Sequence, residues 1–162
     1  MDILFEQDLV QNSGLSSEAL FTAVKAYCDT KRRGEGLPFP LAFLVLPVVF
    51  HSRSAAALKS RSGAGALYKA IQDEHELVVG LQRRMECMYR RTLDACSIAL
   101  SSGWMAYDPE NAEFLPAVKS LPSAIVHVQP EVRDIVSAAK RLGRSFAELS
   151  IGEISMILEV VF

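Results

Sequence analysis

The sequence predicts a mainly α fold, a compact helical domain of about six helices with one small β-hairpin. Several segments carry apolar residues three and four positions apart, which is the spacing of one helix face. One segment, residues 104–115, instead has strand-like runs on both sides of a turn. The chain has 162 residues, of which 50% are hydrophobic and 22% charged, as in a single folded domain rather than a disordered segment.

Residues 1–14 are expected to form an N-terminal arm, and residues 15–162 the single helical domain. The first helix is expected to begin at residues 16–18, where two serines and a glutamate supply N-cap hydroxyls and a first-turn carboxylate. Its end is expected at the basic residues 31–33 and Gly34. The apolar positions between them have helical spacing: Leu20, Phe21, Val24, Tyr27 and Cys28.

The most apolar segment is residues 37–50, with the sequence LPFPLAFLVLPVVF. Its 14 residues are fewer than the roughly 20 that a membrane span needs, so a buried helix is expected. Pro38 and Pro40 fit a first helical turn, and Pro47 is expected to kink the helix. Three prolines also argue against a strand here.

This segment is apolar on every side, which predicts two buried faces rather than one. Phe39, Phe43 and Leu46 share one stripe and are expected to face the core of the domain. A second face carries Leu44, Val48 and His51, and we expect it to contact a partner protein. The substitution Val48→Asp should then leave the isolated chain folded and abolish assembly.

The middle of the chain predicts a short helix, a long helical segment and the hairpin. Residues 52–65 are expected to form a short helix and a loop, and residues 66–102 a helical segment with a break near residues 72–73. The hairpin at residues 104–115 follows the helix directly, with its turn at residues 108–111. A helix followed at once by a hairpin predicts a winged-helix-like arrangement. The apolar stripe of the long segment comprises Leu77, Leu81, Met85, Met88, Thr92, Cys96 and Ala99.

The last third predicts two further helices after a connector with a short extended piece at residues 125–128. Pro130 fits the first turn of one helix, which Gly143 is expected to end or interrupt. The final helix is expected over residues 150–161, with Glu153 in its first turn.

Composition and motifs exclude most catalytic classes. A formal net charge of −2 does not favour a polycationic nucleic-acid binder. The sequence has no phosphate-binding loop, no nucleophile elbow and no histidine or cysteine pair at metal-ligand spacing, so no catalytic residue, cofactor or metal is expected. Three cysteines are too few for a disulfide framework, and the acidic N-terminus does not resemble a signal peptide. We therefore expect a cytoplasmic protein.

Four arginines form the strongest charged pattern. Arg83, Arg84, Arg90 and Arg91 recur after seven residues, which returns to nearly the same face of a helix. Such a stripe can bind phosphates or an acidic partner. Nearby carboxylates, including Glu86, offer the alternative of local pairing on a solvated face.

Two runs carry a resemblance to a known family. One is Leu-Pro-x-Pro-Leu at residues 37–41, and the other is Leu-Gly-Arg-x-Phe-Ala at residues 142–147. Across residues 20–158 the chain resembles the middle component of three-component ABC systems, bacterial operons that also encode an SMC/Rad50-like ATPase and a variable effector. Ser145 departs from this pattern, in which a tryptophan is expected at that position.

The resemblance implies a non-enzymatic adaptor subunit. Its partners would be the SMC/Rad50-like ABC ATPase and an effector, expected to be a nuclease, in a Lamassu-type anti-phage or anti-plasmid defence complex that reaches DNA as a whole and involves no membrane. It also implicates Arg144 as an interface residue, and Pro38, Pro40, Pro47 and Gly143 as scaffold or interface positions. The alternative is a winged-helix DNA-binding protein, although residues 104–115 contain no Lys or Arg.

Overall fold

The computed structural model describes residues 12–61, 63, 65–122 and 129–162. This part of the chain forms seven α-helices, one 3-10 helix and three short strands, which confirms the mainly helical class with a small antiparallel sheet. The elements in chain order are α2 (Ser13–Lys31), β1 (Leu37–Pro38), α3 (Phe39–Val49), α4 (Ser52–Lys59), α5 (Ala66–Asp73), η1 (His75–Leu77), α6 (Leu81–Ser101), β2 (Met105–Asp108), β3 (Glu113–Pro116), α7 (Pro130–Ala147) and α8 (Ile151–Leu158).

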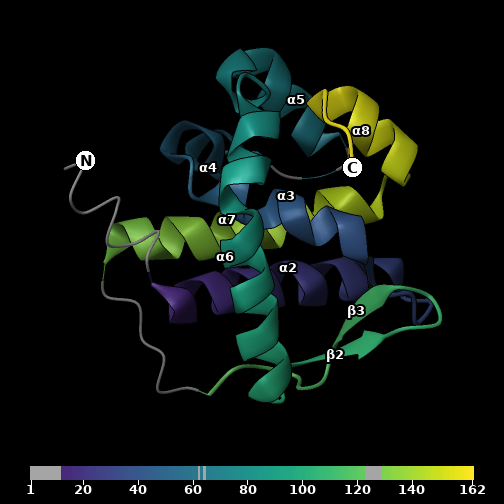
Figure 1. The fold of residues 1–162 in the computed structure, drawn as a ribbon. Helices are drawn as coiled ribbons and strands as arrows, with labels where there is room; N and C mark the ends of the chain where they lie inside the picture. Colours follow the sequence, from purple (N-terminus) through teal and green to yellow (C-terminus); the bar gives the residue numbers. More distant parts are fainter. Residues whose placement is uncertain (1–11, 62, 64, 123–128) are drawn as a thin grey trace.

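The helices pack in crossed layers around one continuous core (Figure 1). Helices α2 and α7 lie side by side and make the most extensive contact between any two elements. The long helix α6 crosses in front of them and packs on α2 and α3. The small sheet lies at one edge, where β3 packs on α2.

Helix α2 begins earlier than predicted. Its N-cap is Asn12, whose side-chain oxygen accepts a hydrogen bond from the Leu15 backbone N–H at 3.0 Å. Ser16 and Ser17 lie one turn inside the helix and are buried, and their hydroxyls donate to backbone carbonyls one turn earlier. The prediction that these serines begin the helix was therefore wrong by about one turn, and the helix starts inside the expected arm.

The proline-rich segment forms a strand as well as a helix. Leu37 and Pro38 pair with β3, although the prolines argued against any strand. The pairing is compatible with proline because β1 has two residues and lies at the edge of the sheet, in the order β1-β3-β2. Helix α3 then starts with Pro40 in its first turn and continues through Pro47 to Val49.

The predicted hairpin is present, with Tyr107 opposite Phe114. One Asp108 carboxylate oxygen accepts from the Glu110 backbone N–H at 2.9 Å and the other from the Asn111 side-chain amide at 2.7 Å, which closes the turn. Gly36 leads into the sheet at close range, since a Cβ there would lie 2.6 Å from the Phe114 carbonyl oxygen. The winged-helix assignment remains a prediction.

The long helical segment breaks where the sequence predicted. Helix α5 ends at Asp73, and α6 starts after Gly80, whose φ of 70° is a left-handed conformation that glycine adopts without strain. The predicted stripe is buried across this break, with Met88 partly covered. Its members therefore point into the core from two separate helices.

Gly143 does not end a helix, which corrects the sequence prediction. Helix α7 runs through it to Ala147, and Gly143 lies where α7 packs directly against the backbone of α2. A Cβ at this position would lie 2.2 Å from the Ala23 carbonyl oxygen. The absence of a side chain allows the two backbones to touch.

The C-terminal helix α8 is shorter than predicted and has a complete capping box. The Ser150 hydroxyl accepts from the Glu153 backbone N–H at 3.2 Å, and the Glu153 carboxylate accepts from the Ser150 backbone N–H at 2.7 Å. Within the described residues no single helix has the length and apolar character to cross a membrane. Helices α3 and α4 together have sufficient length and apolar character, but they are bent by 101° relative to each other. The extended piece predicted at residues 125–128 lies outside the described residues.

Candidate functional site

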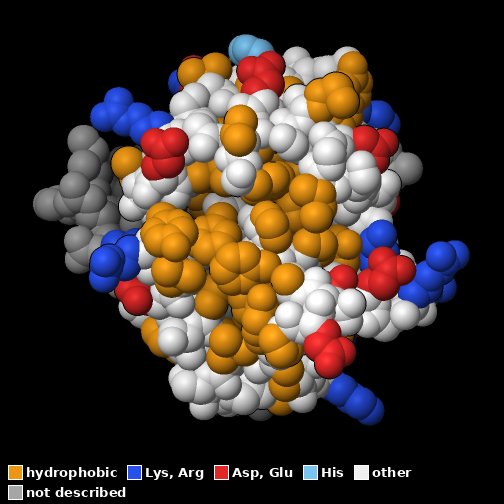
Figure 2. Space-filling model, turned by 45° about the vertical axis from the view of Figure 1, so that its right-hand side comes forward, with side chains coloured by type: hydrophobic (Ala, Val, Ile, Leu, Met, Phe, Trp, Pro, Cys, Tyr) orange, Lys and Arg blue, Asp and Glu red, His pale blue; other side chains and the backbone are white. Residues whose placement is uncertain are grey.

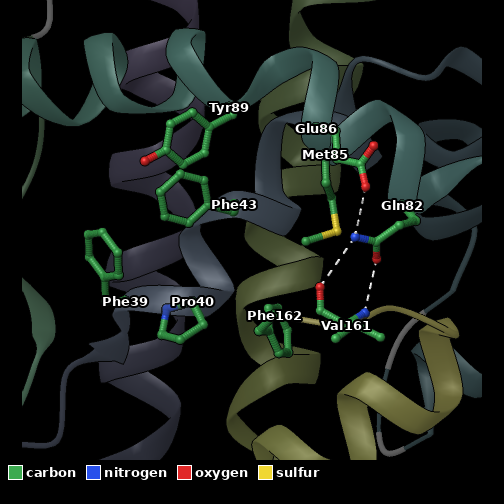
Figure 3. Close-up of a pocket in the computed structure, with 9 residues that line it drawn as sticks. All are labelled: Phe39, Pro40, Phe43, Gln82, Met85, Glu86, Tyr89, Val161 and Phe162. Atoms are coloured by element: carbon green, nitrogen blue, oxygen red, sulfur yellow. Dashed lines mark hydrogen bonds between the residues drawn. The ribbon is translucent and has the colours of Figure 1, made fainter.

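A groove with apolar walls lies between α3, α6 and the end of the chain (Figure 3). Its volume is about 300 Å³. Residues three and four positions apart share a helix face, so each helix presents one row of side chains to the groove. The lining residues are Phe39, Pro40 and Phe43 of α3, Gln82, Met85, Glu86 and Tyr89 of α6, and the terminal Val161 and Phe162.

Aromatic rings form one wall of this groove. The Phe43 ring stacks on Tyr89 of α6, with centroids 5.3 Å apart and planes 15° from parallel. Phe39 meets the Phe43 ring edge-on at 5.2 Å and stacks on Phe114 of the sheet at 5.8 Å. These contacts fix the rings to three elements, yet Tyr89 keeps 56% of its surface exposed.

Three residues that line the groove, Gln82, Glu86 and Val161, are joined to one another by hydrogen bonds. The Gln82 amide nitrogen donates to Glu86 and to the Val161 carbonyl, both at 3.3 Å, and the Gln82 oxygen accepts from the Val161 backbone N–H at 2.9 Å. These bonds hold the chain end against α6. The groove is therefore mainly apolar, and the backbone N–H and C=O groups of Val161 are already hydrogen-bonded to Gln82.

Hydrophobic side chains extend beyond the groove. Figure 2 shows them gathered over the middle of one face, with the charged side chains mostly around its edge. Val161 and Phe162, which line the groove, are 77% and 46% exposed. A contiguous exposed apolar surface of this kind is typical of an interaction site.

The expected partner face of α3 is internal, which corrects the sequence prediction. Leu44 and Val48 are both 0% exposed. Helix α3 is covered by α2, α4, α6 and α7 of the same chain, so the cover that we expected from a partner comes from its own fold. Neither side chain is available to another protein.

His51, the third residue of that face, caps the next helix. Its Nδ1 accepts from the Ser54 backbone N–H at 3.4 Å and lies 2.7 Å from the Ser54 hydroxyl oxygen, at the start of α4. Burial, and secondarily the charge of Arg84, lowers the His51 pKa below its usual value. The geometry gives His51 a structural role.

The expected core face of α3 is partly external, which is the second correction. Leu46 is fully buried as predicted. Phe39 and Phe43 are only partly covered and line the groove. The stripe was identified correctly, but its two N-terminal residues lie at the groove instead of being fully buried in the core.

The arginine stripe divides into separate environments. The Arg84 guanidinium donates to the carbonyls of Pro47, Val79 and Leu77 at 3.2, 2.8 and 2.9 Å, and its burial lowers its pKa. Arg83 is exposed, whereas Arg90 and Arg91 line a different hollow together with Asp94. The four guanidinium groups therefore do not form one surface.

Arg144, the remaining predicted interface residue, is exposed on α7. It lines neither the groove nor the hollow beside Arg90 and Arg91.

Two of the three cysteines are covered by the fold, whereas Cys87 is exposed. Burial raises the pKa of Cys28 to about 11 and that of Cys96 to about 12, so both thiols stay protonated at neutral pH. Among the described residues no three His, Cys, Asp or Glu side chains come together to hold a metal ion. His127 falls outside the described residues.

Sequence reasoning missed the contributions of Tyr89, Val161 and Phe162. Tyr89 lies beside the buried stripe of α6 and shares a helix face with Gln82 and Glu86. A face that carries these polar residues is expected to be exposed to solvent. Val161 and Phe162 follow the last helix and have no periodic partners. Their position depends on the hydrogen bonds between Val161 and Gln82, and no local sequence pattern predicts a contact between residues so far apart.

The fold and the groove define the class: a small, mainly helical protein with an apolar surface groove beside a tightly packed helix pair. The chain belongs to the family described as ABC-three component (ABC-3C) system Middle Component 3, whose family model matches residues 2–162. No curated protein and no solved structure matches the chain. The protein is therefore a component of an ABC-3C system, which confirms the family resemblance found in the sequence.

Proposed function

We propose that this protein is a non-enzymatic adaptor that joins an SMC/Rad50-like ABC ATPase to an effector, a nuclease, in a cytoplasmic bacterial defence complex of the Lamassu type. Its family membership makes it a component of an ABC-3C system, and this supports an association with the other components. The adaptor role itself rests on the apolar groove.

The groove supports an adaptor because it exposes apolar surface in the isolated chain. Burial of such surface stabilises a complex by about 25 cal/mol per Å² before the costs of association. Phe43 and Tyr89 offer aromatic rings held in place by mutual stacking, and aromatic side chains of this kind are enriched at the centres of interfaces. A partner side chain therefore meets a wall that needs little rearrangement.

The groove favours a helix over an extended strand as the bound segment. An extended segment binds by hydrogen bonding its backbone to free backbone groups. Here Gln82 occupies both backbone groups of Val161, and the opposite wall is the helix α3. A helix satisfies its own backbone and contributes only a row of side chains. We propose that an amphipathic helix of another component fills the groove.

The absence of a catalytic role is part of the same proposal. Its support is the sequence, which has no nucleophile-elbow motif, no phosphate-binding loop and no histidine or cysteine pair at metal-ligand spacing. The raised thiol pKa values of Cys28 and Cys96 agree with it, since neither group is a ready nucleophile. The chemistry of the system would then reside in the ATPase and the effector.

The test is copurification from cells that express all components of the operon, with an affinity tag on this protein. Wild type is expected to retain the other components, and Tyr89→Glu to lose at least one, because a carboxylate would enter the apolar groove. The matched control is Met156→Glu, at a side chain that is 75% exposed and does not line the groove. Copurification of neither component with wild type would overturn the adaptor proposal, and equal loss in both variants would overturn the assignment of the groove.

A further inference from the structure

A second surface of the molecule carries a concentration of positive charge. Two hollows, of about 310 and 230 Å³, lie along α2 and α7, and Arg144 lines both of them. They share no residue with the apolar groove. We call the pair the basic channel.

The channel is basic although the chain is not. Six cationic side chains line it, against three carboxylates, in a protein whose formal net charge is −2. The formal charge of this lining is therefore positive, opposite in sign to that of the whole chain. The cations are Lys25, Arg61, Lys119, Lys140, Arg141 and Arg144, and the carboxylates are Glu18, Asp29 and Glu148.

Four of these six cations, Arg141 among them, have no acidic partner in the described part of the chain. Lys25 pairs with Asp29 at 2.9 Å, and Arg61 pairs with Asp73. Lys119, Lys140 and Arg144 make no ion pair with any described residue, and all three are exposed. Three unneutralised charges therefore converge on the first hollow from two separate segments of the chain.

The packing of the fold brings these charges together. Gly143 allows α7 to touch α2, and Lys140 and Arg144 stand on either side of it in the sequence. The contact places both beside Lys25 of α2 in one hollow. In the neighbouring hollow, Arg141 donates through Nη1 to the Arg61 carbonyl, while its buried Nε–H has no acceptor among the described residues.

We propose that the basic channel binds the phosphodiester backbone of a nucleic acid. Such a backbone presents single negative charges at regular intervals along a path, which suits cations distributed over two adjoining hollows. Lys and Arg bind phosphate oxygens without reading base edges, so the binding is independent of base sequence. The site is separate from the proposed adaptor groove and does not rest on it.

The test uses the purified full-length chain and fluorescence anisotropy with a labelled 30-base-pair DNA duplex and a single-stranded RNA of equal length. Affinity for the duplex is measured from 50 to 200 mM salt. Three phosphate contacts give a slope of about −3 in log affinity against log salt, and the double variant Lys140→Gln with Arg144→Gln is expected to reduce its size by about 2. The RNA arm is expected to show a shallower slope for the same contacts.

The matched control removes the same charge from exposed positions of α6, by Arg83→Gln with Arg90→Gln. It is expected to keep the wild-type slope, and circular dichroism confirms that both double variants are folded. Failure of wild type to bind either nucleic acid at 50 mM salt would overturn the proposal. An equal change in both double variants would also overturn it, because binding would then follow overall charge. Loss of copurifying components from the channel variant, without any nucleic-acid binding by wild type, would assign the channel to an acidic protein instead.

Discussion

Two helix pairs in this protein solve the same packing problem in opposite ways. Helices α2 and α7 touch through Gly143, where a single methyl group would lie 2.2 Å from the Ala23 carbonyl oxygen. Helices α3 and α6 pack through their buried residues but carry Phe39, Phe43 and Tyr89 at their outer edge, where a groove remains. The size of the side chains at a crossing thus decides whether a helix pair closes completely or leaves a surface for another molecule.

The inner face of α3, which carries Leu44 and Val48, is as fully buried as the contact between α2 and α7. Val48→Asp tests this with the largest expected effect, because a carboxylate at a site with 0% exposure loses its hydration without gaining a partner. We expect a loss of about 4 kcal/mol in the free energy of unfolding, or insoluble protein. This outcome is the reverse of what the sequence predicted for the same substitution.

The control for Val48→Asp is the same substitution at Val79, which is 57% exposed and precedes α6. Urea unfolding of Val79→Asp is expected to match wild type within about 0.5 kcal/mol. A soluble, stable Val48→Asp protein that fails only in assembly would restore the original assignment of this face to a partner.

Gly143→Ala tests the closed pair and has the next largest effect. The added methyl group collides with the Ala23 backbone, which cannot rotate away as a side chain could. We expect a loss of about 3 kcal/mol in urea unfolding. Gly152→Ala in α8 is the control, since its Cβ would meet only the Ser150 hydroxyl at 4.0 Å, and it is expected to gain about 0.5 kcal/mol from helix propensity. Equal stability of the two variants would show that the α2–α7 contact can separate without cost.

Much of the fold was predictable because it depends on local patterns. The stripe of α6, the break before it and the hairpin at residues 104–115 all follow from spacing and turn chemistry within a few residues. Gly143 shows the limit of this reasoning. A glycine near the end of a helical pattern often indicates a C-terminus, and only the position of α2 shows that Gly143 is a point of close helix contact instead.

The site was less predictable because it depends on which side of an apolar helix the rest of the chain covers. Periodicity separated Phe39 and Phe43 from Leu44 and Val48 correctly, but it could not say which set faces outward. That choice is made by α2, α4, α6 and α7, which are distant in sequence. The arginine stripe is divided for a similar reason, since Arg84 donates hydrogen bonds to backbone carbonyls on α3 and before α6.

Arg84 of α6 connects this helix to α3 and to the preceding turn by hydrogen bonds, a set of contacts that we call the brace. Its substitution tests whether the α3–α6 pair depends on hydrogen bonds as well as on apolar contact. Arg84→Met keeps the unbranched stem and leaves three carbonyls, those of Pro47, Leu77 and Val79, without this donor. We expect a loss of about 2 kcal/mol in urea unfolding, reduced from the sum of three bonds by access to water. The neighbouring Arg83→Met, at an exposed side chain, is expected to change stability by less than about 0.5 kcal/mol, and equal effects would contradict the brace.

The smallest expected effect is a pH dependence at His51, where α3 passes into α4. Burial, and then the charge of Arg84, lowers its pKa in the folded protein, so the folded state resists a proton that the unfolded state accepts. Stability is therefore full above the unfolded pKa of about 6.5 and falls as the pH drops below it. Urea unfolding at pH 7.5 and 5.5 measures this loss of stability. His51→Asn keeps an acceptor for the Ser54 N–H and is expected to lose less stability on acidification than wild type.

Arg84→Met should also weaken the pH dependence of stability, because the positive charge that opposes protonation of His51 is gone. If His51→Asn showed the same acid loss as wild type, the titrating group would lie elsewhere, and the end of α3 would be held by apolar contact alone.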